Sequence, residues 1–299
     1  MTTAVEPRPA QLPLSGGSEA ATVTVEPLLC GEVNAPPTFF DRPTGPLWAL
    51  RAVLAARSGW HWLPVPAFLV RHPSAGAILI DTGFHTTVAS DPTQNLGQIA
   101  GRVQRIRMVR DQAACDQLER RGCPPSAVAL VLMTHLHFDH ASAISELGGA
   151  TFVLDRAEWD AAAKGGLRQG YNTRHFDHAF DWQAIDFEGP QIESFASFGR
   201  TADLLGDGSV RLLSTPGHTL GHISVLLRLS AGREILLCGD AIYSRDSLTQ
   251  DLAPLFCADD HLYRRSRAEI RRYAEQTPSA VIVPGHDPNV WPELAPRYE

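Results

Sequence analysis

Short apolar runs recur along the chain, and each one ends in a polar or glycine-containing corner. Each run has four to six apolar residues and is rich in Val, Ile and Leu. Uninterrupted runs of this kind are typical of strands that are buried on both faces of a sheet. We therefore predict five such strands, within residues 75–83, 127–135, 210–218, 234–240 and 280–286.

Three other stretches place apolar residues at helical spacing: 46–59, 111–122 and 261–276. In the second stretch, Ala114, Cys115 and Leu118 share one face, and Gly122 is the expected C-cap. The mixed order of strands and helices predicts an α/β fold in which helices cover the sheets. Functional sites in such folds gather where strands end.

Length and composition narrow the class of protein. The 299 residues, 44% of them hydrophobic, suit one large globular domain over residues 21–299. Residues 1–20 are rich in Pro, Gly and Ala, which predicts a flexible tail rather than a signal peptide. The net charge of -7 argues against a nucleic-acid partner.

The spacing of the cysteines and the length of the apolar runs indicate in which cellular compartment the protein is expected. The five cysteines are scattered without a C-x-x-C pair, so we expect a reducing cytoplasm rather than a disulfide framework. No stretch reaches the roughly twenty apolar residues that a membrane span needs, so we expect a soluble protein without a membrane partner. A homodimer is left open.

The corner after the second run, "HLHFDH", holds four potential metal ligands within six positions. His135, His137 and Asp139 alternate, so an extended chain would project them to one side. His140 falls outside that alternation and requires the backbone to turn, which we expect to happen in the helical "ASAISELG" that comes next.

Three further corners end in His218, Asp240 and His286. Together with "HLHFDH" they supply five imidazoles and two carboxylates, a set that suits zinc and also manganese, iron or cobalt. A single histidine at a strand end is usually an ordinary packed or surface residue. Four ligands in six positions with three matching corners instead predict a metal site.

These corners resemble the signature of the metallo-β-lactamase superfamily: "THLHFDHAS", "TPGHTLGH", "CGDAIY" and "VPGHD", with "DTGFH" upstream. Within it, "HLHFDHA", "VPAFLVRHPSAGAILIDTG" and Tyr243 are most similar to the N-acyl homoserine lactonases. One departure is "ASAIS" after His140, where many relatives continue with glycines.

The resemblance implies a four-layered αβ/βα sandwich, in which two mixed sheets are flanked by helices and a dinuclear centre lies at one edge. By that likeness, His135, His137 and His218 would hold one zinc ion. Asp139, His140 and His286 would hold the other, and Asp240 would bridge the two.

The implied reaction opens the ring of an N-acyl homoserine lactone, a small-molecule substrate, by attack of a hydroxide shared by the two metals. Tyr243 would donate to the developing oxyanion, although a tyrosine packed in the core is the alternative. Asp240 would also take or pass a proton when the ring opens.

Other activities remain open within the superfamily. One is a glyoxalase II-like thioesterase or another esterase or phosphotriesterase. A second is an iron oxygenase or electron-transfer protein, and a third is a non-catalytic metal-binding module. The complete ligand set and a histidine at position 137 favour hydrolysis.

Several residues near these motifs have two interpretations. Asp81 either orients a ligand histidine or caps its own turn. The second "HFDH", His175 to His178, is expected on a surface helix or loop. His222 is expected to pack on a strand or to support a ligand. Phe138 is expected in the core, with a role in the pocket as the alternative. The stretch 46–62 would either contact an acyl chain or pack as an ordinary helix.

Overall fold

The computed structural model describes residues 4–43, 47, 50, 54 and 59–299 of the chain. The helix predicted at 46–59 falls largely outside the described residues, so the structure does not bear on it. No helix in the described ranges is long and apolar enough to cross a membrane.

The described strands form two sheets. The first sheet has the order β1-β8-β7-β6-β4-β3-β2-β5, and the second has the order β14-β13-β12-β11-β10-β9. Strands of the first sheet are β1 (Arg8–Pro9), β2 (Thr24–Ala35), β3 (His61–His72), β4 (Gly76–Ile80), β5 (Ile106–Arg107), β6 (Val128–Leu132), β7 (Thr151–Asp155) and β8 (Asp181–Ile185). Strands of the second sheet are β9 (Glu193–Phe195), β10 (Phe198–Asp203), β11 (Val210–Ser214), β12 (Ile223–Arg228), β13 (Glu234–Leu237) and β14 (Val281–Val283).

Both sheets are mixed. In the first, β4, β6, β7 and β8 run parallel, while β2 and β3 pair antiparallel. In the second, only the pair β13 and β14 is parallel among the described strands.

Helices connect and cover the sheets. The α-helices are α2 (Pro92–Leu96), α3 (Ala100–Val103), α4 (Ala114–Arg120), α5 (Phe138–Ala141), α6 (Arg156–Lys164), α7 (Thr173–Phe176), α8 (Asp246–Thr249) and α9 (Asp260–Gln276). Short 3₁₀ turns are η1 (Pro37–Phe39), η2 (Thr86–Ala89), η3 (Pro125–Ala127), η4 (Ile144–Leu147), η5 (Leu167–Gln169), η6 (Ser230–Gly232), η7 (Gly239–Ala241) and η8 (Trp291–Glu293).

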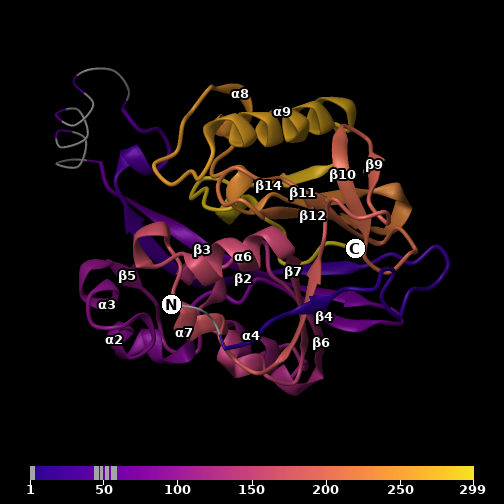
Figure 1. Cartoon of the computed structure of the whole chain (residues 1–299), viewed down its shortest axis with the longest axis horizontal. Helices are drawn as coiled ribbons and strands as arrows, with labels where there is room; N and C mark the ends of the chain where they lie inside the picture. Colours follow the sequence, from indigo (N-terminus) through magenta and orange to yellow (C-terminus); the bar gives the residue numbers. More distant parts are fainter. Residues whose placement is uncertain (1–3, 44–46, 48–49, 51–53, 55–58) are drawn as a thin grey trace.

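Three core clusters define four layers (Figure 1). The central cluster lies between the sheets and contains Ile78 and Leu132 from one sheet and Leu212 from the other. The outer face of the first sheet packs on α4 and α6, and the outer face of the second packs on α9 through Ile270 and Tyr273. This is the predicted four-layered α/β sandwich, with two mixed sheets flanked by helices.

The five predicted strands are confirmed as β4, β6, β11, β13 and β14. Their apolar runs are continuous because alternate residues pack on opposite faces of the sheet, as expected for strands buried on both faces. Leu79 packs in the outer cluster of the first sheet, whereas Ile78 and Ile80 pack between the sheets.

Two predicted helices are confirmed as α4 and α9. Gly122 comes after the end of α4 with a φ of +67°, the left-handed conformation that ends many helices. Its N–H donates to the Glu119 carbonyl, as a residue after a helix C-terminus commonly does.

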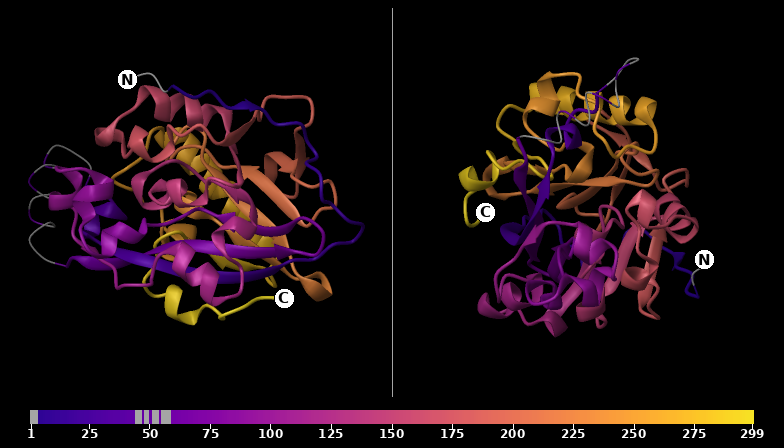
Figure 2. Two further views of the ribbon diagram at one scale, coloured as in Figure 1. Left: turned by 90° about the horizontal axis from the view of Figure 1, so that it is seen from below. Right: turned by 90° about the vertical axis from the view of Figure 1, so that its left-hand side faces the viewer.

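The N-terminal segment differs from the expected flexible tail. In β1, Arg8 and Pro9 pair with Gln183 and Ala184 of β8, which adds a strand to the first sheet. Leu14 N–H donates to Leu204 O at 2.8 Å, so the segment also reaches the second sheet. From residue 4 onward it runs along the outside of the domain (Figure 2), because these backbone hydrogen bonds attach it there.

Candidate metal centre

The structure brings the seven predicted ligands together, although they come from four different segments of the chain. They form two buried clusters, and within each cluster the potential ligand atoms lie within 4.8 Å of one another. The first cluster is His135, His137, His218 and Asp240, and the second cluster is Asp139, His140 and His286. The corners after β6, β11, β13 and β14 therefore meet at one edge of the sandwich, as the sequence predicted.

The local backbone of "HLHFDH" differs from the predicted alternation. Strand β6 ends at Leu132, and α5 begins at Phe138 with His137 as its N-cap. Asp139 and His140 therefore both lie on a helical turn, and only His135 and His137 precede it. The helical turn begins three residues earlier than expected, which directs Asp139 and His140 toward the second cluster.

In the first cluster, ring nitrogens converge on one another. His218 Nε2 lies 2.8 Å from His137 Nδ1 and 3.2 Å from His135 Nε2. Asp240 Oδ2 lies 3.2 Å from the same His218 nitrogen.

The second cluster has more carboxylate character. His286 Nε2 lies 3.4 Å from His140 Nε2 and 3.6 Å from Asp139 Oδ2. Asp240 Oδ1 lies 3.3 Å from His140 Nε2 and 3.1 Å from His286 Nε2. The carboxylate of Asp240 thus presents one oxygen to each cluster, which is the arrangement that a bridging ligand requires.

An aspartate behind the second cluster orients one of its rings. His140 Nδ1 lies 2.7 Å from Asp81 Oδ2, and Asp81 also accepts from the backbone N–H and hydroxyl of Thr134. Of the two interpretations of Asp81, contact with a predicted ligand histidine is the one that the structure shows. Asp81 holds a φ of +55° in this position, which is uncommon for a residue other than glycine.

Two further rings of the clusters contact backbone oxygens. His286 Nδ1 lies 2.8 Å from Pro64 O, and His218 Nδ1 lies 3.1 Å from Phe256 O. His222, fully buried, accepts at Nε2 from the backbone N–H of Asp240 at 2.9 Å. Of the two expectations for His222, contact with a predicted ligand residue is the one that this bond shows.

The pKa values of the histidines shift in opposite directions in the two clusters. Burial lowers the pKa of His135 and His218 well below the ordinary value, and lowers the pKa of His137 to about 4. Burial also opposes charge on His140 and His286, but the carboxylates around them outweigh it and raise the pKa of both. Asp240 contributes most to raising the pKa of both rings.

These residues fit a metal ion. Buried imidazole nitrogens point toward one another at hydrogen-bonding distance, and neutral rings with pKa values below the ordinary range cannot supply a proton to every such contact. Asp240 Oδ1 is buried and lacks a hydrogen-bond partner of ordinary geometry. A buried polar atom of this kind calls for a partner, and a cation among nitrogen and oxygen ligands provides one.

Tyr243 lies at the same centre. Its side chain is buried, and its hydroxyl is 2.8 Å from His218 Nδ1. Its ring stacks on His286 with a centroid distance of 5.8 Å. The tyrosine is therefore both packed in the core and adjacent to the clusters, so the two interpretations made from the sequence do not exclude each other.

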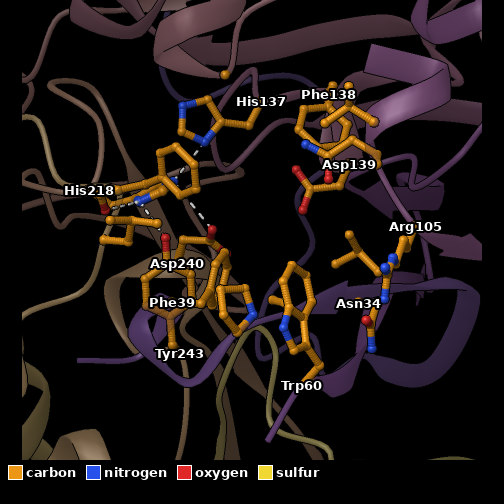
Figure 3. Close-up of a pocket in the computed structure, with 18 residues that line it drawn as sticks. Asn34, Phe39, Trp60, Arg105, His137, Phe138, Asp139, His218, Asp240 and Tyr243 are labelled. Atoms are coloured by element: carbon orange, nitrogen blue, oxygen red, sulfur yellow. Dashed lines mark hydrogen bonds and ion pairs between the residues drawn. The ribbon is translucent and has the colours of Figure 1, made fainter. Parts of the chain in front are cut away.

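A cavity of about 260 Å³ opens onto the clusters (Figure 3). Its floor includes His137, Asp139, His218, Asp240 and Tyr243. Its walls are mainly apolar and include Val33, Ala35, Phe39, Trp60, Val103 and Phe138, with Asn34 and Arg105 as polar members.

The sequence identified this wall only in part. Phe138 was expected in the core, but it is half-buried, stacks on Phe84 and lines the cavity, because α5 begins there. Trp60 belongs to the stretch expected to contact an acyl chain. Phe39 and Val103 come from short segments that carry no motif, and their sequence offers no signal of this role.

The second "HFDH" lies away from the clusters. His175 is buried in α7 and contacts Asn172 and the backbone oxygen of Asn95. The predicted helix or loop is the short helix α7, and His175 lies on its buried face while Arg174 is exposed.

Comparison with known proteins bears on the family. The model of the metallo-beta-lactamase superfamily matches residues 60–286. The chain is 36% identical over 244 residues to the N-acyl homoserine lactonase AttM of Agrobacterium fabrum, and the match covers 79% of this chain and 87% of that protein. The chain belongs to the metallo-beta-lactamase superfamily.

Other superfamily members extend the likeness. An N-acyl homoserine lactonase of Bacillus cereus is 26% identical, over 75% of this chain and 82% of that protein. A solved N-acyl homoserine lactone hydrolase with bound N-hexanoyl-L-homoserine has a TM-score of 0.74 and 21% identity, covering 93% of this chain and all of that one. That structural likeness supports the superfamily fold.

Proposed function

We propose that the protein is a metal-dependent hydrolase that opens the lactone ring of N-acyl homoserine lactones. One observation carries the proposal: the two clusters contain all seven predicted ligands, and a mainly apolar cavity opens onto them. The 36% identity to an N-acyl homoserine lactonase supports the choice of substrate.

We propose zinc as the metal at both clusters, with iron, manganese or cobalt as the alternatives that the same ligands accept. His135, His137 and His218 would hold one ion, Asp139, His140 and His286 the other, and Asp240 would contact both. Two such cations, when bound, supply a water that ionises near neutral pH and an electrophile for the carbonyl oxygen.

The residues of the chain prepare the reaction in other ways. When Nε2 of His218 faces the cluster, the ring carries its proton on Nδ1. This N–H donates to Phe256 O or to the Tyr243 oxygen. The Tyr243 proton is then free to point into the cavity toward an oxyanion, where donors lower the barrier. Asp240, between both clusters, is placed to receive a proton and pass it to the alkoxide that leaves the ring.

The cavity matches the rest of the substrate. Phe39, Trp60 and Val103 offer apolar surface for an acyl chain, and each buried CH₂ contributes about 0.8 kcal/mol. Asn34 and Arg105 supply polar groups within reach of an amide in the same cavity. We infer that longer acyl chains bind more tightly until the cavity is filled. A homodimer and a cytoplasmic location stay predictions.

Ring opening releases a proton, so a pH-indicator assay tests the proposal directly. Purified protein loaded with zinc is given N-acyl homoserine lactones of increasing chain length, γ-butyrolactone as the control without an acyl chain, and a glutathione thioester. We expect turnover of the acyl lactones, with KM falling as the chain lengthens. Fast hydrolysis of the thioester with no lactone turnover would replace the proposal with a thioesterase.

A further inference from the structure

Glu158 is a fully buried carboxylate for which the proposed ring opening has no use. It lies in the first turn of α6, on the outer face of the first sheet, and is 0% exposed. A buried carboxylate is costly unless it receives hydrogen bonds, so the groups around it indicate its purpose.

The first group belongs to the strand end that carries two ligands. Leu136 N–H donates to Glu158 Oε1 at 2.8 Å. Leu136 stands between His135 and His137, so this bond restrains the backbone on which both rings are mounted.

The second group belongs to the loop of His218. Burial raises the pKa of Glu158, and the Thr219 hydroxyl and the N–H of Gly221 oppose that shift because they favour the charged form. The hydroxyl acts at longer range, because neither it nor Glu158 Oε2 has a partner of ordinary hydrogen-bond geometry. A Cβ on Gly221 would lie 2.0 Å from the Glu158 backbone nitrogen, so only glycine lets this loop approach α6 so closely.

The third group comes from the segment that covers His137. Burial and the nearby Glu158 carboxylate both raise the pKa of the Tyr171 hydroxyl, and the Tyr171 ring lies 5.0 Å from the His137 ring between centroids. Beside it, Gly170 has a φ of +86°, and a Cβ there would lie 2.6 Å from His137 Cδ2. This segment therefore closes directly over the outer side of the ring.

We propose that Glu158 is a positioning residue for the first cluster: its carboxylate joins the strand end of His135 and His137, the loop of His218 and the segment over His137. Leu136 N–H donates to it directly, and the Gly221 N–H and the hydroxyls of Thr219 and Tyr171 lie around the same carboxylate, which can accept from such donors. The inference rests on the metal centre of the proposed function, but it makes no assumption about the substrate.

The tests compare metal binding by matched variants. Glu158→Gln keeps the shape but places an NH₂ group against donors. Asp155→Asn is the control, because Asp155 is a second buried carboxylate of the same helix start, and its hydrogen bond is to Ala157 N–H of α6 rather than to a segment that carries a ligand. Cobalt is titrated into each metal-free protein, the visible spectrum is followed, and urea unfolding of each metal-free protein is measured in parallel.

We expect Glu158→Gln to weaken one of the two cobalt equivalents about 10- to 100-fold, the usual effect of losing a contact that orients ligands. Asp155→Asn should bind both equivalents as the wild type does. Asp81→Asn, whose contact is to His140, should weaken the other equivalent and so identifies which one Glu158 serves.

Equal cobalt binding by wild type and Glu158→Gln would overturn the inference, as would the same loss in Asp155→Asn. Should Glu158→Gln fail to fold, Tyr171→Phe decides: a selective loss in the same equivalent supports the inference, and unchanged binding overturns it. Absence of lactone turnover alongside a selective cobalt loss would refute the proposed function and leave the role of Glu158 intact.

Discussion

The two clusters use the same kind of side chain in opposite electrostatic settings. In the first cluster, burial lowers the pKa of all three imidazoles, and the outward nitrogen of His218 meets a backbone carbonyl and a tyrosine hydroxyl. In the second cluster, carboxylates raise the pKa of His140 and His286, and Asp81 contacts His140 directly. Neutral dipoles thus support one cluster, whereas charged groups support the other.

This difference shows how one fold distinguishes two adjacent sites. The first cluster depends on backbone position, since its histidines lie on loops that other residues must hold together. The second cluster depends on fixed negative charge close to its rings. Perturbations of loop packing and perturbations of charge should therefore affect different cations.

The largest effect is expected for Asp240, because its carboxylate contacts histidines of both clusters. Asp240→Asn changes the one side chain that reaches both clusters, so both cobalt equivalents should weaken together. Lactone turnover should fall more than about 100-fold, because even contacts that only orient ligands are worth 10- to 100-fold. Cobalt titration and the pH-indicator assay measure the two effects, and loss of a single equivalent would remove Asp240 from its bridging position.

Tyr243→Phe distinguishes two roles of the tyrosine hydroxyl: stabilising the oxyanion and holding His218 in place. If the hydroxyl stabilises the oxyanion, kcat should fall about 100-fold while both cobalt equivalents bind normally. Steady-state kinetics and metal content are compared on the same preparations. A parallel loss of turnover and of one equivalent would instead make the contact with His218 the main role of Tyr243.

Asp81→Asn tests the charged support of the second cluster. Asn tolerates the left-handed backbone that Asp81 adopts, so the turn should survive while the charge beside His140 is lost. One cobalt equivalent should weaken about 10- to 100-fold, and the unfolding of the metal-free protein should change little by comparison. The same equivalent responding to Glu158→Gln would contradict the division between the clusters.

The last prediction concerns stability and pH, away from both clusters. Burial raises the pKa of Asp155 to about 8 from 3.8, so the folded state holds a proton that the unfolded chain releases. Stability should therefore fall as pH rises between these values, by at most about 1.4 kcal/mol per pH unit for one proton. Asp155→Asn should have the flatter profile in urea unfolding of the metal-free protein from pH 5 to pH 8, and identical slopes would reject this assignment.

Much of the architecture can be predicted from the sequence because its signals are local. Apolar runs with glycine corners predicted β4, β6, β11, β13 and β14, and those corners carry the residues that meet at one edge. The motif resemblance added the layer order and the grouping of the ligands. Asp81 could be interpreted only in part, since its bond to His140 joins residues 59 positions apart.

The parts that sequence could not predict depend on packing between distant segments. Glu158 occupies an ordinary amphipathic helix, and nothing at that position indicates that Leu136 and Gly221 will approach it. The early start of α5 moved Phe138 from the expected core to the cavity wall. Phe39 reaches the cavity from a turn without regular periodicity.

The attachment of the first residues has a practical consequence for protein engineering. Arg8 and Pro9 pair with β8, which would otherwise be an exposed edge strand. Proline has no N–H, so Pro9 cannot donate a hydrogen bond to a further strand. Trimming the chain to residue 21 would uncover a row of unpaired backbone groups. Shortened versions should therefore tend to self-associate through β8, and affinity tags are better added ahead of residue 4 than substituted for residues 4–20.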